Sequence, residues 1–446
     1  YEMSASLVGS EMCIRDSRKA ARSGGKLKEF VPLYDMDAAV NVCKQFVGCE
    51  YDRVYDIAEG IKIRFTDVGH LLGSASIEVW ATEKTENGDV TEKIVFSGDI
   101  GNINKPIIKD PKHVRDADYV VMESTYGNRS HGGTPNYVED LTDIFKRTFE
   151  RGGNVVIPSF AVGRTQELLY IIRKIKEDNL VGRDFDVYMD SPLAIEATNI
   201  FVKNVESCFD DEAVELVRKG INPLSFPGLK YATTGDESKQ INFDPNPKVI
   251  ISSSGMCEAG RIRHHLKHNL WRPECTIVFV GYQAVGTTGR IIVDGAEEIK
   301  LFGEPIQIKA EIVQLKGSSG HADKDGLLCW INAFDTKPKK VFVVHGEDSV
   351  CDEFTECLKE EYGYDAMAPY TGGSYDLIAD RVISEGVKER KTRRTTSTQR
   401  GKTVFDRLVA AGKRLMTVIT HNEGGTNKDL AKFTDQINAL CDKWDR

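Results

Sequence analysis

Short apolar runs of strand length recur along the chain, and amphipathic stretches lie between several of them. Residues 61–65 alternate apolar and polar side chains, as half-buried strands do. The apolar runs at 77–80 and 94–96 flank Asn87-Gly88, a dipeptide typical of a tight hairpin turn. Further strand-length runs lie at 119–122, 155–157, 187–189, 249–251, 277–280, 312–315 and 341–344. Apolar residues recur at helical spacing within 36–46, 166–175 and 354–361. Strands mixed with helices in this order predict an α/β protein.

The pattern changes near Gly386, where a polar and basic segment begins. Residues 388–400 contain six Lys or Arg among Thr, Ser and Gln, which indicates an exposed basic linker. Beyond it, apolar residues at helical spacing predict a small helical extension: Val404, Leu408, Ala411, Leu415 and Val418, then Phe433, Ile437, Leu440 and Trp444. We interpret this extension as a docking helix pair, with an RNA-contacting tail as the alternative.

Composition narrows the class of protein. The chain has 446 residues, enough for two to four domains of about 100–200 residues each. No window approaches the ~18 consecutive apolar residues of a membrane span, and no apolar signal core follows the N-terminus. Ten cysteines without a CxxC pair indicate reduced thiols. We therefore expect a cytoplasmic protein with no membrane partner, and the net charge of -9 still permits a local basic cleft.

Ionisable residues follow five of the predicted strands, each beside glycine or serine. In chain order they are His70, Asp99, Glu123, His321 and His345. Ligands of open α/β sheets bind at the carboxyl ends of strands, so these side chains are candidates for one site. One such residue would be explained by a turn that satisfies its own backbone, but five together favour a functional site.

Three of the five, His70, Asp99 and His345, are good ligands for a first-row metal. Neutral imidazole and carboxylate groups bind zinc, and a carboxylate can bridge two metals that clamp a phosphodiester. Three ligands do not complete a two-metal site, and His70 is the first histidine of the sequence. The remaining ligands of such a site are therefore absent from residues 1–69.

Nine stretches of the sequence carry a resemblance to a known family. In order they are DVGHLLGSASIEVW, FSGDIGN, ESTYGNRSH, IPSFAVGRTQELL, DSPLA, ISSSGMCEAGRIRHHLKHNL, VFVGYQAVGTTGR, GSSGHAD and VVHGE. On these motifs, which span roughly 32–377, the chain resembles the β-CASP branch of the metallo-β-lactamase superfamily. That branch contains zinc nucleases, including the pre-mRNA 3′-end cleavage factor and its bacterial and archaeal relatives.

The resemblance implies a fold and an activity. The fold would be α/β: a metallo-β-lactamase αββα sandwich with its N-terminal part missing, an inserted α/β β-CASP cap domain and a C-terminal helical extension. In the intact enzyme, two zinc ions would activate a water or hydroxide for in-line attack on an RNA phosphodiester. RNA is thus the expected partner, and a homodimer is the candidate assembly.

The resemblance also assigns a role to each strand-end residue. His70 matches the third-motif zinc ligand, Asp99 the carboxylate that bridges both zinc ions, and His345 a ligand of the second zinc. His321 matches the histidine that acts as general acid or holds the scissile phosphate, and Glu123 the acidic residue that supports it. A histidine at the last of these motifs, as in His345, favours RNA over DNA.

One family signature, HxHxDH, is absent from the printed sequence. It should precede His70 together with an upstream aspartate, and these residues supply most of the zinc shell. We therefore expect this chain to bind zinc poorly and to be inactive. The first seventeen residues show no strand or helix period, so we interpret them as unrelated sequence joined to an N-terminally truncated nuclease.

A second group of residues is expected to face RNA from the cap. It comprises Ser253, Ser254, Gly255, Met256, Arg261, His264, His265, Arg164 and Tyr282. The Ser-Gly loop precedes a helix whose N-terminus could bind a phosphate. Arg164 could meet an anion or pair with a local carboxylate, and Tyr282 could stack on a nucleotide or simply pack. For His264 and His265, hydrogen bonding to RNA and a plain polar helix face remain alternatives.

These expectations define the domains. They are a non-family leader at 1–17, an incomplete first part of the metallo-β-lactamase domain at 18–125, the β-CASP domain at 126–308, a return segment at 309–385, and the linker and helical extension at 386–446. The preferred function is a zinc-dependent ribonuclease. The alternative is a non-catalytic RNA-binding subunit, and a hydrolase of small phosphoesters is less favoured because the cap is large.

Overall fold

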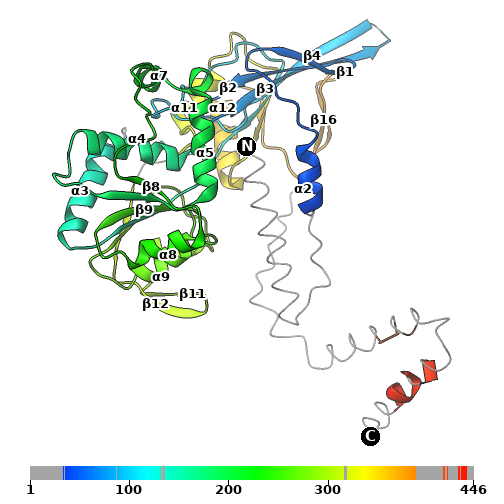
Figure 1. Cartoon of the computed structure of the whole chain (residues 1–446). Coiled ribbons are helices and arrows are strands. Elements are labelled where there is room, and N and C mark those ends of the chain that lie inside the picture. Colours follow the sequence, from blue (N-terminus) through cyan, green and yellow to red (C-terminus); the bar gives the residue numbers. More distant parts are fainter. Residues whose placement is uncertain are drawn as a thin grey trace. The chain divides into compact units, whose positions relative to one another are not determined.

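The computed structural model describes most of the chain and divides it into two compact units, Tyr1–Gly386 and Val387–Arg446 (Figure 1). The described residues are 34, 36–86, 88–130, 132, 136–315, 319–387, 415, 416, 419, 430, 431 and 433–438. Within these residues, no helix combines the length and the apolar character needed to cross a membrane. The proposed leader at 1–17 and most of the proposed helical extension lie outside them.

The first unit contains a seven-stranded sheet of order β1-β2-β3-β4-β5-β14-β15. Its strands are Val54–Ala58 (β1), Ile61–Asp67 (β2), Ala75–Thr85 (β3), Gly88–Phe96 (β4), Tyr119–Glu123 (β5), Lys340–Val344 (β14) and Ala366–Met367 (β15). Strands β1 to β4 are antiparallel, and β4, β5, β14 and β15 are parallel. The predicted hairpin is present as β3 and β4, although Asn87 at its tip lies outside the described residues.

Helices α11 (Lys324–Ile331) and α12 (Asp348–Glu360) cover one face of this sheet. Alternate strand residues, such as Val120 and Met122, pack there against Trp330 and Phe354, because successive side chains of a strand point to opposite faces. On the other face, Tyr119 forms a smaller apolar cluster with the segment that carries β16 (Ser374–Asp376). Strand β16 pairs with β17 (Arg381–Ser384).

A second sheet has six strands in the order β13-β10-β6-β9-β7-β8. They are Val155–Pro158 (β6), Asp186–Met189 (β7), Leu229–Tyr231 (β8), Lys248–Ser252 (β9), Thr276–Phe279 (β10) and Glu311–Gln314 (β13). All pairings are parallel. Parallel strands need crossover connections, which explains the helices between them.

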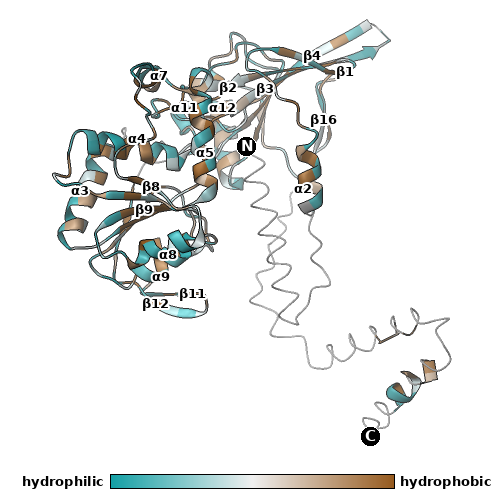
Figure 2. Cartoon of the chain, viewed as in Figure 1, coloured by the Kyte–Doolittle hydropathy of each residue, from teal (hydrophilic) through white to brown (hydrophobic). Residues whose placement is uncertain are grey.

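Helices cover both faces of the six-stranded sheet, and Figure 1 shows β8 and β9 between α4 on one side and α8 and α9 on the other. The helices are Tyr137–Glu150 (α3), Arg164–Glu177 (α4), Pro192–Lys203 (α5), Val205–Cys208 (α6), Asp211–Arg218 (α7), Gly235–Phe243 (α8), Ile262–Asn269 (α9) and Thr288–Val293 (α10). A small hairpin, Glu298–Leu301 (β11) and Glu304–Gln307 (β12), follows α10. Figure 2 shows both hydrophilic and hydrophobic residues on helices such as α3 and α8, as expected for helices with one buried face.

The predicted α/β class is confirmed, with two differences in detail. The helix expected at 36–46 is α2 (Met36–Cys43). Strand β13 pairs with β10 in the six-stranded sheet, so that sheet extends beyond residue 308. Among the described residues, the seven-stranded sheet carries α11 and α12 on one face and the β16–β17 pair on the other, and the αββα sandwich stays a prediction.

Candidate active site

Four of the five predicted strand-end residues come from the seven-stranded sheet. Asp99 and His345 follow β4 and β14, and Glu123 is the last residue of β5; these strands are adjacent and parallel, so their carboxyl ends share one edge. His70 follows β2 after a short turn in which the Asp67 carboxylate accepts a hydrogen bond from the Gly69 amide. His321 reaches the site differently, because it lies between β13 of the other sheet and α11.

Glu123 and His321 form the central pair of the site. His321 Nδ1 lies 3.1 Å from both carboxylate oxygens of Glu123, which is buried and also accepts a 2.5 Å hydrogen bond from the Ile100 amide. Burial alone would raise the pKa of Glu123, but the hydrogen bond and charge of His321 lower it. Burial alone would lower the pKa of His321, but Glu123 raises it. This pair therefore has the arrangement of an oriented acid–base histidine and its supporting carboxylate.

The three predicted metal ligands surround this pair. Asp99 lies 3.9 Å from His70 Nε2 and 3.2 Å from His345 Nε2, measured to its carboxylate oxygens. The His321 ring centroid is 4.4 Å from that of His70 and 5.9 Å from that of His345. The structure thus brings all five strand-end residues together, although the tightest cluster of donor atoms, within 4.8 Å of one another, joins His70 and Asp99 to His321.

The donors of this cluster suit zinc. His70 Nδ1 is buried and has no hydrogen-bond partner, and burial together with the charge of His321 lowers the pKa of His70 to about 4. A neutral imidazole beside a carboxylate is a usual zinc donor set, and catalytic zinc sites use three protein ligands. With His321 paired to Glu123, His70, Asp99 and His345 are the donors that fit one zinc ion, whereas a second ion would need donors beyond these.

A close backbone approach keeps the His70 ring in place. A Cβ atom on Gly320 would lie 3.0 Å from Cε1 of the His70 ring, so a side chain there would displace the imidazole. The backbone of Gly101 also forms a bridge with that of His321. These contacts explain why the motif around His321 has glycine immediately before the histidine.

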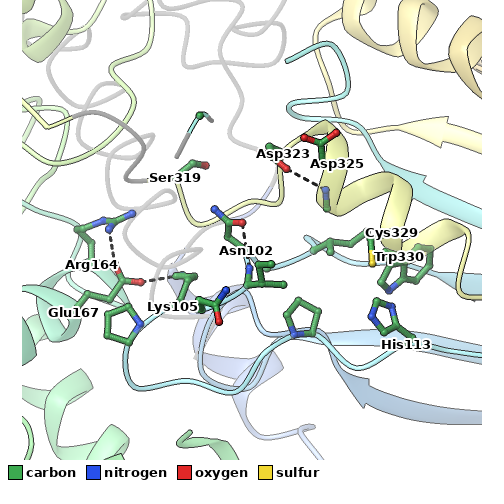
Figure 3. Close-up of a pocket in the computed structure, with 18 of the residues that line it drawn as sticks. Asn102, Lys105, His113, Arg164, Glu167, Ser319, Asp323, Asp325, Cys329 and Trp330 are labelled. Atoms are coloured by element: carbon green, nitrogen blue, oxygen red, sulfur yellow. Dashed lines mark hydrogen bonds and ion pairs between the residues drawn. The ribbon is translucent and has the colours of Figure 1, made fainter. Parts of the chain in front are cut away.

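A cavity of about 460 Å³ lies beside this centre (Figure 3). Its wall includes residues 100–106, which follow Asp99, and Ser319, which accepts a hydrogen bond from the His321 amide. Lys105, Arg164 and Glu167 lie at one side of it, and the Lys105 ammonium is 2.9 Å from the Glu167 carboxylate.

Arg164 pairs with Glu167, one helical turn further along α4. The ion-pair alternative for Arg164 is therefore the one found. Lys105 completes this group and also donates a 3.2 Å hydrogen bond to the His70 carbonyl. Through Lys105, the ion pair with Glu167 on α4 is thus connected to the backbone of His70, a predicted metal ligand.

Arg261 and His265 both contact the buried carboxylate of Asp190. Arg261 donates to Asp190 at 2.7 Å, and His265 Nε2 lies 2.6 Å from the same carboxylate. His265 is 0% exposed, and its other ring nitrogen lies 2.9 Å from the Asn242 side-chain oxygen. The expectation that His265 contacts RNA is therefore corrected, because its ring has no exposed surface. Arg261 also donates to the backbone carbonyls of Ala232 and Thr233, which follow β8, so its guanidinium is held by protein partners.

The other cap residues lie at the carboxyl ends of β9 and β10. Ser253 and Ser254 follow β9 and are half-buried; Ser254 Oγ has no hydrogen-bond partner, and Ser253 Oγ donates to Ser191 at 3.0 Å. Gly255 is buried and Met256 is half-buried. Tyr282, after β10, is exposed.

His264 is exposed on α9, and its ring stacks on Phe302 with a centroid distance of 4.4 Å. The two alternatives expected for His264 were an RNA contact and a plain polar helix face. The structure adds a third feature, the packing of its ring on an aromatic side chain. The i,i+4 neighbour His268 is also exposed.

Sequence reasoning missed Asp190 and Glu167, which organise the cap side of the site. Asp190 directly follows β7, so the strand-end rule that selected Asp99 and Glu123 would also have selected it. No sequence pattern pointed to Glu167, because its partner Lys105 lies 62 residues earlier, in the segment that follows Asp99.

Comparisons with known proteins give two matching domain families and several relatives. Residues 165–292 match the Beta-Casp domain, and residues 305–369 match the Zn-dependent metallo-hydrolase RNA specificity domain. The chain is 35% identical to Ribonuclease TTHA0252 of Thermus thermophilus, over 65% of this chain and 63% of that protein. It is 32% identical to Transcription termination factor FttA of Methanosarcina mazei, over 78% of this chain and 54% of that protein. It is 35% identical to an RNase J-like protein of Methanocaldococcus jannaschii, over 65% of each. The chain therefore spans less than two thirds of the length of these relatives.

Proposed function

Because the chain belongs to the β-CASP branch of the metallo-β-lactamase superfamily, we propose that it carries the RNA-cleaving site of a zinc-dependent ribonuclease. The substrate would be the phosphodiester backbone of RNA, held between the seven-stranded sheet and the cap. The observation that carries this proposal is the buried Glu123–His321 pair, which is surrounded by His70, Asp99 and His345 at one edge of the sheet.

The chain's own residues divide the chemistry among them. His70, Asp99 and His345 would hold zinc, two ions when the ligand set is complete, and bound zinc activates water and offsets charge on the phosphodiester. His321 would deliver a proton to the leaving oxygen as the phosphodiester breaks. Glu123 would keep the His321 ring oriented through the 3.1 Å contacts to Nδ1. The fold proposed around these residues is the αββα sandwich of the superfamily, interrupted by the cap.

On the cap side, we assign RNA contact to the loop after β9 and to Tyr282. The Ser253, Ser254, Gly255 and Met256 segment would meet the backbone through its amides and hydroxyls, and His264 would border it. Arg164 and Arg261 would act indirectly, because each already pairs with a buried carboxylate. Supporting residues of this kind fix the geometry of a site without touching the substrate.

A second candidate function is RNA binding without cleavage. The observation that favours it is the absence of any histidine before His70 in the 446 residues, which limits the zinc ligands that this chain supplies. We accordingly propose that the 446-residue chain by itself binds zinc weakly and does not cleave RNA at an appreciable rate.

One experiment separates the two functions. The chain, and the chain together with any in-frame coding sequence found before Tyr1, are loaded with zinc and incubated with unstructured RNA labelled at either end. Cleavage that is lost in His321→Ala and Asp99→Ala, but not in Glu215→Gln at an exposed position on α7, would support the nuclease. If the extended, zinc-loaded protein cuts no RNA while its Asp99→Ala variant binds RNA equally well, the nuclease is refuted and the binding function remains.

A further inference from the structure

Three loops of the six-stranded sheet meet around one exposed aromatic side chain, Phe160. Strands β10, β6 and β9 are adjacent and parallel, so the loops that follow them emerge side by side. Continuing the β10–β6 register past Ile277 and Val156 aligns Gly281 with Phe160. Phe160 is 45% exposed, and Tyr282, the next residue after Gly281, is 48% exposed.

The loops around Phe160 are tied to one another by hydrogen bonds. The Ser159 amide donates to the Ser252 carbonyl at 3.0 Å, which joins the loops after β6 and β9. The buried Gln283 side chain donates to the carbonyls of Gly255 and Gly281 at 3.0 and 3.3 Å, which joins the loops after β9 and β10. The exposed ring therefore stands on a rigid base rather than on a mobile tip.

Two glycines lie beside the Phe160 ring. A Cβ atom on Gly255 would lie 3.0 Å from Cδ2 of Phe160, and one on Gly281 would lie 3.9 Å from Cε2. At Gly255, therefore, a side chain would be in tight contact with the ring. The backbone of Phe160 is fixed as well, because its carbonyl accepts hydrogen bonds from the Thr165 amide and hydroxyl at the start of α4.

The Phe160 loop also touches the segment that carries His70. A Cβ atom on Gly163, whose φ is 81°, would lie 2.4 Å from Cδ2 of Leu71. Phe160 is three residues before Gly163, so their Cα atoms are at most about 11 Å apart. The loop that carries the exposed Phe160 ring thus packs against Leu71, the residue that follows the candidate zinc ligand His70.

We propose that Phe160 and Tyr282 form a stacking platform for unpaired bases of an RNA strand whose phosphodiester lies at the His70–His321 centre. This inference rests on the proposed function. Stacking suits an RNA-cleaving site, since aromatic faces accept any base and need no particular sequence. A platform of this kind selects single-stranded RNA, because bases in a duplex already stack on one another.

A binding cycle tests the platform without any cleavage. The probes are a short unstructured oligoribonucleotide and a fully abasic ribose-phosphate chain of the same length and charge, with affinities measured by fluorescence anisotropy in the absence of zinc. Phe160→Ala is expected to weaken binding of the base-containing RNA about 5- to 100-fold and to leave the abasic chain unchanged. Phe160→Trp should retain the affinity, and Phe160→Leu, which keeps apolar volume without an aromatic face, should not.

Two further variants keep the test decisive if Phe160→Ala disturbs the fold. Tyr282→Ala should show the same preference for the base-containing probe, and Phe243→Ala, at an exposed phenylalanine on α8, should show none. Equal losses on both probes, or full affinity in Phe160→Leu, would overturn the platform while leaving the proposed RNA-binding function intact. Concentration-dependent dimerisation of the wild type that Phe160→Ala abolishes would overturn it in favour of a second copy of the chain. Failure of the wild type to bind either probe would refute the proposed function itself.

Discussion

Replacing Glu167 with glutamine leaves Lys105 and Arg164 without the carboxylate that lies between them. Glu167 is in the first turn of α4 and is 6% exposed; one oxygen lies 2.9 Å from the Lys105 ammonium and the other pairs with Arg164. Burial alone would raise the pKa of Glu167, but the two cations lower it, so the carboxylate is charged in the folded protein. The perturbation therefore removes one negative charge from a buried group of three.

The loss of unfolding free energy in Glu167→Gln can be estimated from the burial of Lys105 and Arg164. Breaking a buried ion pair by removing one partner costs about 3–5 kcal/mol, because the remaining charge stays desolvated. Lys105 and Arg164 each retain a little exposure beside the cavity, which favours the lower figure, about 3 kcal/mol. At about 2 °C per kcal/mol for a large folding unit, the Tm should fall by about 6 °C.

The assay is thermal unfolding together with hydrogen exchange. A control lies on α7, where Glu215 pairs with Lys219 and the two side chains are 66% and 65% exposed, so Glu215→Gln should cost less than about 1 kcal/mol. Since Lys105 also donates to the His70 carbonyl, Glu167→Gln should speed amide exchange around residues 69–73, whereas Glu215→Gln should not.

Two results would refute this reasoning. Equal melting temperatures for Glu167→Gln and Glu215→Gln would show that the buried position of Glu167 adds no stability. A large loss of stability without faster exchange at 69–73 would show that the group stabilises the cap alone and does not hold the His70 segment.

Three further predictions concern other parts of the molecule. Burial alone would raise the pKa of the Glu78 carboxyl, but its two cationic partners lower it. The stability that the charged carboxylate contributes is therefore complete above its unfolded pKa of about 4.3 and is lost as the pH falls through the folded value. In urea titrations, the difference in unfolding free energy between wild type and Glu78→Gln should shrink below about pH 4. Asp190→Asn should lower stability by about 3 kcal/mol in denaturant unfolding, since three donors would face a neutral amide, and an unchanged midpoint would contradict the buried network. His70→Ala and Asp99→Ala should each weaken zinc binding at least about tenfold by calorimetry, while His264→Ala should leave it unchanged; equal affinities would exclude His70 and Asp99 as ligands.

Much of the sheet architecture could be predicted from local pattern. The hairpin of β3 and β4 and the runs that became β5, β6, β9 and β14 were visible, because alternation and short apolar runs depend only on neighbouring residues. The same reasoning predicted that the strand-end residues would gather, and the structure brings them to one centre. It did not predict that His321 arrives from β13 of the other sheet, because sheet membership depends on pairing between distant strands.

The cap residues show where local reasoning stops. Arg261 and His265 look like free cationic groups in the sequence, and both prove to hold Asp190, which lies 71 and 75 residues earlier. A side chain's partner is set by the packing of whole elements, so a motif indicates which chemistry is available but not where it is used. Phe160 is the converse case, an apolar residue whose exposure becomes visible only when three strand ends are assembled.

The sequence by itself determined the α/β class, the family and the identity of the groups that carry chemistry, because residue types, periodicity and motif order are written along the chain. The tertiary structure alone decided which of these groups meet. It set the 3.1 Å contact between Glu123 and His321, turned Arg164 toward Glu167, and left Phe160 exposed above a rigid base. The physical reason is that burial and pairing are properties of three-dimensional packing. A charged group or ring that its neighbours bury and pair supports the fold, whereas one that they leave exposed can contact a ligand.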